Sequence, residues 1–340
     1  MFKKSFLFKK IHFKKWILIL FILLAPSTAF IYTINYLVDP YGTKEIVCKN
    51  IYKPVLKERA KKYSYIFKED NIAKYDSLIL GSSRVMQIIP SHISNGAYYN
   101  FGVHVGSNAE SLFIIEEWLK KKPLKNVYLG IDLYSFHIHK DPLNANELKF
   151  KEQYSHNHLS FDTLKLSIKS LNYQKHNSPQ SFFERDGELN YFSDNMKMKE
   201  NNYDFSNSRY EQNAKNNYKL NFIDNPFEIE YKVFSILKEI NKLSKAHNFK
   251  LYVFITPKHD FAWELAVNNK KLHKEFNLIK QNLVDIFGTV YDFTIESPYN
   301  KNNKNFYDPY HYTPSLGDKI IQTLQSNGSD YGTILTKESN

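Results

Sequence analysis

The chain opens with one long apolar stretch and continues as short apolar runs separated by amphipathic segments. Residues 16–38 are almost wholly apolar, broken by Pro26-Ser27-Thr28 and by Asn35. A run of this length is enough to cross a bilayer as one helix. Lysines precede it and little charge follows it, which predicts a cytoplasmic amino terminus. We therefore expect a basic cytoplasmic tail over residues 1–15 and a transmembrane signal anchor over residues 16–38.

A cleaved signal peptide is the alternative interpretation of the same stretch. Ser27-Thr28-Ala29 resembles a small-residue cleavage site, but the apolar run continues for nine residues beyond Ala29. That continuation favours an uncleaved anchor. Under either interpretation the rest of the chain lies outside the cytoplasm, in the periplasm or on the outer face of the cell membrane.

Beyond the anchor, the pattern changes to short buried strands alternating with helices. A charged amphipathic helix is expected over residues 55–67. Apolar runs predict strands of a parallel sheet at residues 78–80, 97–101, 126–131, 251–255 and 290–293. Helical spacing predicts a helix capped by Ser107 or Asn108, helices over residues 227–247 and 272–286, and a last helix opened by Thr313-Pro314. This alternation predicts a doubly wound α/β sheet in one domain over residues 39–330, with a tail at 331–340.

Residues 141–224 interrupt the α/β pattern. They are polar, rich in Asn, Lys, Tyr and Phe, and poor in aliphatic residues. A hairpin with an Asp-Gly turn is expected at residues 182–191, and a helix at residues 164–171. We expect an insertion that covers the active-site face rather than an independent domain. Its aromatic residues either stack on sugar rings or pack the insertion against the main domain.

The charge of the chain is concentrated at its start. The formal net charge is +11, and six lysines lie within the first 15 residues, which leaves about +5 for the remaining 325 residues. So small an excess does not point to a nucleic-acid partner. The single cysteine, Cys48, excludes an intramolecular disulfide.

Candidate chemistry lies at two distant places in the chain. The strand at residues 78–80 runs into Gly81-Ser82-Ser83-Arg84, and Asp308 precedes His311 by three residues near the carboxyl end. Ligands bind at the carboxyl ends of strands in open α/β sheets. A Gly-Ser loop alone often only ends a strand. An early Ser with a late Asp-x-x-His, however, makes the parts of a serine–histidine–aspartate triad.

At these residues the chain resembles the SGNH, or GDSL-like, hydrolase superfamily. The resemblance covers residues 77–323 apart from the insertion, with Ser83 at the nucleophile position and Ser82 in place of the usual Asp. With an anchor helix, the chain looks most like the membrane-anchored branch that includes teichoic-acid D-alanylation and alginate O-acetylation proteins. The resemblance implies an SGNH-type sheet and a serine esterase or acyltransferase without a cofactor. It also implies an envelope polysaccharide substrate and a membrane-bound O-acyltransferase partner.

The resemblance also implies three donors for the oxyanion of the reaction: the nucleophile's amide, a Gly amide matched by Gly102, and an Asn side chain. At the Asn position this chain has Asp132, and an ionised carboxylate cannot donate a hydrogen bond. Asp132 is therefore protonated, or it is structural, or Asn100 or Asn108 replaces it. We expect Arg84 either to meet an anionic substrate group or to bind a loop carboxylate.

The remaining histidines suggest no metal site. His137 and His139 alternate, but neither has the cysteine or acidic partners that a metal site needs, so loop positions are expected. His259 follows a strand and is expected to contact substrate. The resulting hypothesis is addition or removal of an acyl group, most simply acetyl, on a surface glycan. Its alternative is a catalytically silent glycan-binding or assembly protein with the same fold.

Overall fold

The computed structural model describes residues 3–40, 58–138, 158–174, 204–326 and 330–337. The chain divides into two compact units, one formed by residues 1–61 and 150–181 and the other by residues 62–149 and 182–340. The expected hairpin at residues 182–191, together with Cys48 and His139, lies outside the described residues.

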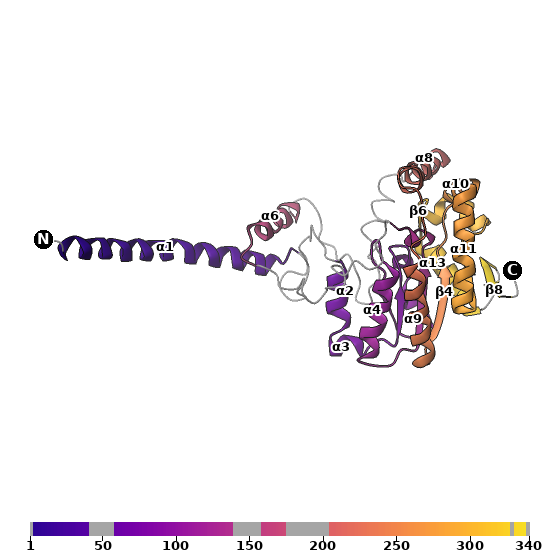
Figure 1. The fold of residues 1–340 in the computed structure, drawn as a ribbon, viewed down its shortest axis with the longest axis horizontal. Helices are drawn as coiled ribbons and strands as arrows, with labels where there is room; N and C mark the ends of the chain where they lie inside the picture. The colour runs from indigo at the N-terminus through magenta and orange to yellow at the C-terminus, as the bar shows by residue number, and fades with distance from the viewer. Residues whose placement is uncertain (1–2, 41–57, 139–157, 175–203, 327–329, 338–340) are drawn as a thin grey trace. The chain divides into compact units, whose positions relative to one another are not determined.

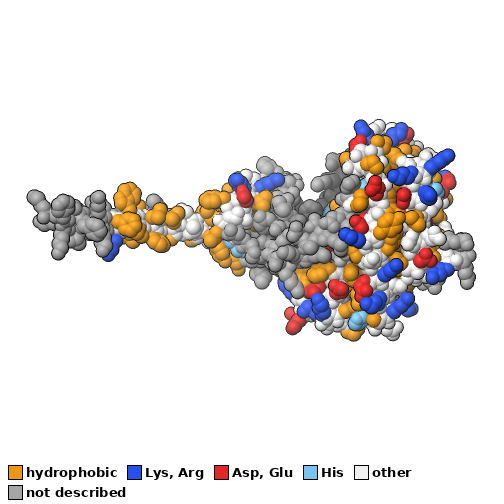
Figure 2. Space-filling view, viewed as in Figure 1, with side chains coloured by type: hydrophobic (Ala, Val, Ile, Leu, Met, Phe, Trp, Pro, Cys, Tyr) orange, Lys and Arg blue, Asp and Glu red, His pale blue; other side chains and the backbone are white. Residues whose placement is uncertain are grey.

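The first unit contains the apolar stretch as one continuous helix, α1 (Lys3–Val38). Its segment Phe13–Val38 is long and apolar enough to cross a membrane, and its described side chains present a mostly hydrophobic surface (Figure 2). The basic residues expected as a tail continue this same helix from Lys3. A second helix, α6 (Phe161–Gln174), packs against α1 and confirms the helix expected around residues 164–171 (Figure 1).

The second unit is built on a six-stranded sheet with the strand order β2-β1-β3-β4-β5-β8. The first five strands are parallel, and β8 pairs antiparallel with β5 at one edge. Their bounds are β1 Ser77–Leu80, β2 Tyr98–Asn100, β3 Asn126–Ile131, β4 Lys250–Ile255, β5 Thr289–Asp292 and β8 Thr333–Thr336. The expected α/β class with a mostly parallel central sheet is confirmed.

The sequence predicted a tail at residues 331–340, but part of this segment belongs to the sheet. Residues Thr333–Thr336 form β8, and the buried Tyr331 donates its hydroxyl hydrogen to Asn300 Oδ1 at 2.7 Å. This short segment lacks a long apolar run, so its sequence gives little sign of a strand. Pairing with β5 supplies the backbone hydrogen bonds that make it one.

Helices pack against the sheet, and side-chain caps fix where several of them begin. The hydroxyl of Ser107 and the carboxylate of Glu110 form a capping box at the start of α4, as expected for Ser107. The main helices are α2 Glu58–Ile66, α3 Glu69–Ile72, α4 Asn108–Leu119, α8 Asn207–Tyr218, α9 Lys232–Ala246, α10 Asp260–Asn268, α11 Lys270–Phe287, α12 Pro298–Lys301 and α13 Pro314–Ser326. Shorter helical turns are η1 Val85–Gln87, η2 Pro90–His92, η3 Leu133–Phe136, η5 Lys219–Ile223 and η6 Asn303–Asn305.

The core lies between the sheet and its helices. α4, α9 and α11 are neighbours in a row (Figure 1). α13 instead buries Leu316, Ile320 and Leu324 in a cluster that includes Ile79 of β1 and Tyr128 of β3. Helix α10, which was not expected, begins directly after His259.

The region expected as one insertion contributes to both units. α6 belongs to the first unit, whereas α8 belongs to the second. Tyr210 of α8 is buried, and its hydroxyl lies within hydrogen-bond reach of the carbonyls of Asn303 and Phe306, two residues before Asp308. The described part of residues 204–224 is thus bound to the segment that leads into the candidate site.

Strand order determines where that site forms. β1 pairs with β2 on one side and with β3 on the other, so the chain's winding reverses direction between β1 and β3. In open parallel sheets, ligands bind at the carboxyl ends of the strands at such a reversal. Ser83 follows β1 and Asp132 follows β3, which brings both to this edge.

Candidate active site

The candidate nucleophile lies on a constrained turn after β1. Gly81 has a φ of +145°, a conformation that side-chain-bearing residues rarely adopt, and an added Cβ would lie 2.7 Å from the carbonyl oxygen of Gly130. Gly106 approaches from the loop after β2, where an added Cβ would lie 2.4 Å from the carbonyl oxygen of Gly81. The turn therefore fits tightly between two neighbouring segments.

Asn100, at the end of β2, holds the segment that follows the turn. Its Nδ2 donates to the carbonyls of Val85 at 2.8 Å and Ile88 at 2.9 Å, and its Oδ1 accepts from the amide of Gly102 at 2.8 Å. The side chain is fully buried. Asn100 therefore positions the nucleophile turn, and its amide is not available as the oxyanion donor considered from the sequence.

Ser83, His311 and Asp308 form one continuous chain of contacts. Ser83 Oγ lies 2.9 Å from His311 Nε2, and His311 Nδ1 lies 2.8 Å from Asp308 Oδ2. Asp308 Oδ1 accepts from the backbone amides of Tyr310 at 2.8 Å and His311 at 3.0 Å. The three residues expected from the sequence are thus brought together, although Ser83 and His311 are 228 positions apart in the chain.

Asp308 and His311 lie on a small β-hairpin, whereas the sequence predicted a loop at this position. β6 (Phe306–Asp308) pairs antiparallel with β7 (His311–Tyr312), and this places the two side chains next to each other. Burial would raise the pKa of Asp308, but the hydrogen bond and charge of His311 and the two backbone amides outweigh it and lower the pKa. An ionised Asp308 accepts the Nδ1 hydrogen of His311, which leaves Nε2 to accept from the serine hydroxyl.

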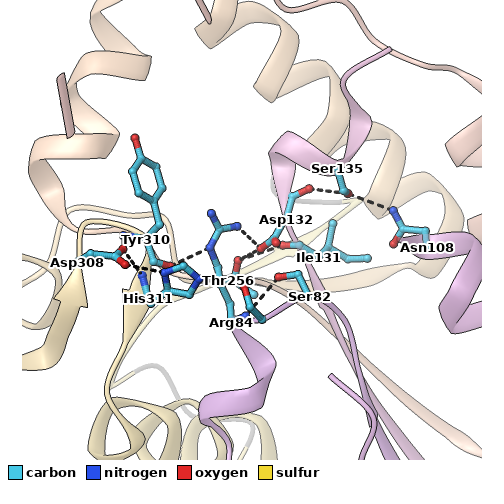
Figure 3. A network of polar contacts seen from close by, with 11 residues as sticks. Ser82, Arg84, Asn108, Ile131, Asp132, Ser135, Thr256, Asp308, Tyr310 and His311 are labelled. Atoms are coloured by element: carbon cyan, nitrogen blue, oxygen red, sulfur yellow. Dashed lines mark hydrogen bonds and ion pairs between the residues drawn. The ribbon is translucent and has the colours of Figure 1, made fainter. Parts of the chain in front are cut away.

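Arg84 forms an ion pair with Asp132 (Figure 3). Both side chains are only 11% exposed. Arg84 Nε also donates to the carbonyl of Tyr310 at 2.8 Å, and the guanidinium lies 5.8 Å from the centre of that residue's ring. Of the two roles considered for Arg84, the structure shows the binding of a loop carboxylate.

Asp132 is surrounded by groups that favour its ionised form. The Thr256 hydroxyl at the end of β4 donates to its Oδ1. Burial raises the pKa of Asp132, but the charge of Arg84 and hydrogen bonds from Ser82, Thr256 and Arg84 bring the pKa below its ordinary value. Of the alternatives considered, the structural role therefore fits Asp132 and the protonated form does not.

The other expected oxyanion donors are engaged elsewhere. The Gly102 amide is bonded to Asn100, and Asn108 Nδ2 donates to Ser135 Oγ at 3.1 Å, on the far side of Asp132 from His311 in Figure 3. The backbone amide of Ser83 makes no hydrogen bond within the described part of the chain. Nη2 of Arg84 likewise has no hydrogen-bond partner among the described residues.

Two histidines that the sequence singled out, His137 and His259, are buried. His259 is 1% exposed, lies 2.7 Å from Asn303 Oδ1 through Nε2, and caps α10 through Nδ1, so the expected substrate contact is wrong. His137 follows η3, outside the regular helices and strands, and its side chain is fully buried with its ring against Phe227. Among the described residues no cluster of His, Cys, Asp and Glu has the arrangement of a metal site.

Several residues that build the site were not recognised from the sequence. The Thr256 hydroxyl donates to Asp132, and the Ser82 hydroxyl accepts from the Arg84 amide. Tyr310 bonds with both Arg84 and Asp308, and Asn100 holds the segment after the turn. The only sequence signal for Thr256 and Asn100 is a polar residue at the carboxyl end of a buried strand. Their partners lie on other strands, so spacing in the sequence does not reveal them.

Comparison with known proteins assigns no family to this chain. The chain matches no known family model and no curated protein. What the residues themselves provide is a serine hydroxyl in contact with an imidazole that a carboxylate orients. Such an arrangement is able to activate the hydroxyl as a nucleophile.

Proposed function

We propose that this protein is a membrane-anchored serine esterase or acyltransferase with the doubly wound sheet of the SGNH hydrolases. The observation that carries the proposal is the contact chain from Ser83 through His311 to Asp308. In the reaction, His311 Nε2 takes the proton of Ser83 Oγ as that oxygen attacks an ester carbonyl carbon. His311 then returns the proton to the leaving alcohol oxygen, and an acyl-serine remains.

The second half of the reaction distinguishes hydrolysis from transfer. Attack by water on the acyl-serine releases a carboxylic acid, and attack by a sugar hydroxyl moves the acyl group to the glycan. We assign an acetyl group and an envelope polysaccharide as the substrates, from the resemblance to the envelope branch. In the transfer direction a membrane-bound O-acyltransferase is the proposed source of the acyl group.

The oxyanion of the tetrahedral intermediate needs hydrogen-bond donors, and this protein keeps only one of the three that the resemblance implies. The amide of Ser83 is one, because it makes no hydrogen bond within the described part of the chain. Nη2 of Arg84 is the second donor that we propose, because the guanidinium is bound between Asp132 and the carbonyl of Tyr310, the residue before His311. An ionised Asp132 takes the place of the family's Asn and orients Arg84 in this arrangement.

The location proposed for the enzyme is the outer side of the membrane. The support is the six lysines within the first 15 residues together with the length and hydropathy of Phe13–Val38. A periplasm-active reporter fused after Asn340 should be active, and a cytoplasm-active reporter at the same position should not. The reverse result would overturn the assigned side and the envelope substrate with it.

Covalent labelling tests the mechanism directly. Full-length protein in detergent is incubated with a serine-directed fluorophosphonate, and the modified peptide is identified by mass spectrometry. We expect an adduct on Ser83, its loss in Ser83→Ala, and its retention in Ser82→Ala, whose hydroxyl faces Asp132. An adduct that persists in Ser83→Ala would assign the nucleophile to another residue.

A catalytically silent glycan-binding or assembly protein is the second candidate, and one observation favours it. The Gly102 amide and the residue-132 side chain are both engaged within the protein, so two of the three implied oxyanion donors are missing. This candidate requires that the protein bind glycan but neither label with the phosphonate nor hydrolyse an acetyl ester. Labelling of Ser83 excludes it.

A further inference from the structure

Helix α6 carries an apolar row that no described part of the protein covers. Phe161, Ile168 and Leu171 are 68%, 47% and 41% exposed, and their spacing of seven and three residues places them on one side of the helix. The small polar residues Thr163, Ser167 and Ser170 are buried instead. α6 therefore turns its small polar side toward the protein and its large apolar side outward.

Asn35 fixes α6 to the carboxyl-terminal part of α1. Its Nδ2 donates to the carbonyls of His158 at 2.7 Å and Ser160 at 3.1 Å, and its Oδ1 accepts from Ser167 Oγ at 2.9 Å. Asn35 is fully buried, although most side chains of the apolar run that contains it are exposed. The amide side chain of Asn35 thus joins α1 to α6.

The length of α1 indicates where this junction lies in a membrane. A hydrocarbon core of about 30 Å is crossed by about 20 helical residues. Counting from Trp16, the first apolar residue after Lys14 and Lys15, twenty residues end at Asn35. Tyr32 and Tyr36 lie at the same level with stacked rings 5.9 Å apart, as interfacial aromatic residues do.

We propose that α6 is an interfacial membrane helix, with its apolar row at the boundary between the lipid headgroups and the acyl chains. This proposal rests on the membrane-crossing role of α1 and is independent of the catalytic assignment. The occupant is lipid because the exposed row is part of a helix bonded to α1 at the depth where the hydrocarbon ends. Lys165 and Lys169 are exposed beside the row, in position to meet anionic headgroups.

Spin-label accessibility tests the proposal on the full-length protein. Single cysteines are introduced by Ile168→Cys and Leu171→Cys in a Cys48→Ser background, labelled with a nitroxide, and reconstituted in vesicles of phosphatidylcholine and phosphatidylglycerol. Asp162→Cys and Lys169→Cys are matched controls on the polar side of the same helix. Ile22→Cys reports on the middle of α1.

The proposal expects the labels at 168 and 171 to collide more with oxygen than with a water-soluble nickel chelate, and the labels at 162 and 169 to show the opposite order. Labels at 168 and 171 that behave like those at 162 and 169 would overturn it. Shielding of 168 and 171 from both reagents would also overturn it, because protein would then cover the row. A water-exposed label at 22 would show that α1 does not cross the membrane, which would overturn this proposal as well. It would not affect the catalytic role proposed for Ser83.

Discussion

Arg84 and Asp132 form a buried ion pair that joins the turn after β1 to the end of β3. The same guanidinium donates to the carbonyl of Tyr310, in the hairpin that carries His311. One side chain therefore contacts the segments that position both the proposed nucleophile and its base (Figure 3). Because Thr256 at the end of β4 also bonds with Asp132, this polar network links three neighbouring strands.

Asp132→Asn should lower stability and activity, even though it introduces the amide that the SGNH resemblance implies. The substitution leaves the Arg84 charge buried without its partner, and breaking a buried ion pair costs about 3–5 kcal/mol. The double variant Arg84→Met/Asp132→Leu should lose less stability than Asp132→Asn. Denaturant unfolding of the full-length protein in detergent measures both, with the exposed Asp285→Asn as the control. A rise in esterase activity in Asp132→Asn would instead show that a missing amide donor limits the site.

Asp308→Asn should reduce turnover of an acetyl ester by up to about ten-thousandfold while the protein stays folded. The amide keeps an acceptor for the backbone hydrogens of Tyr310 and His311 but no longer favours the productive tautomer of the imidazole. Asp318→Asn is a matched control, because Asp318 also lies 2.8 Å from a histidine, His92, in a pair that is about half exposed. Equal activities in the two variants would argue against a triad.

Lys258 should make the stability of the protein rise with pH. It is 3% exposed, and its ammonium lies 5.0 Å from the centre of the Phe276 ring. Burial, with repulsion from Arg84, lowers the pKa of Lys258 from 10.5 to about 7. Between these two values the unfolded chain binds a proton that the folded chain does not bind, so the free energy of unfolding increases with pH. The largest slope is about 1.4 kcal/mol per pH unit.

Lys258→Met should flatten that rise. The measurement is the free energy of unfolding of the full-length protein from about pH 8 to about pH 10, compared with wild type, since both pH values lie between the two pKa values. Lys250→Met, at an exposed position at the start of β4, should keep the wild-type slope. Parallel curves for wild type and Lys258→Met would show that the folded protein holds Lys258 with an ordinary pKa.

Tyr210→Phe should destabilise the second unit by about 1–3 kcal/mol, because the buried carbonyl of Phe306 and the partly buried carbonyl of Asn303 lose their shared donor. Gln212→Ala, at an exposed position on the same helix, should change the free energy of unfolding by no more than about 0.5 kcal/mol. The comparison tests whether α8 belongs to the cooperative fold, as its burial indicates. Identical unfolding of both variants would support the dispensable insertion expected from composition.

The sequence alone was sufficient where structure depends on near neighbours. β3 has the bounds expected from its apolar run, and α4 begins at the cap expected for Ser107. The long apolar run predicted one continuous helix, which the structure contains. The order of Ser83, Asp308 and His311 at strand and loop ends was enough to expect a triad, since parallel strands bring their carboxyl ends to one edge. For the helix and strand bounds, a short-range pattern, periodicity or cap, specifies the element.

Only the tertiary structure decided how the polar groups pair and where the irregular segments pack. Asp132 is an ion-pair partner because Arg84, 48 positions earlier, and Thr256, 124 positions later, both reach it. The Gly102 amide is engaged because Asn100 folds back on it, and Tyr331 and β8 join the domain through contacts with Asn300 and β5. A polar side chain's ionisation and availability depend on which distant groups surround it after folding, and that information is not contained in local periodicity.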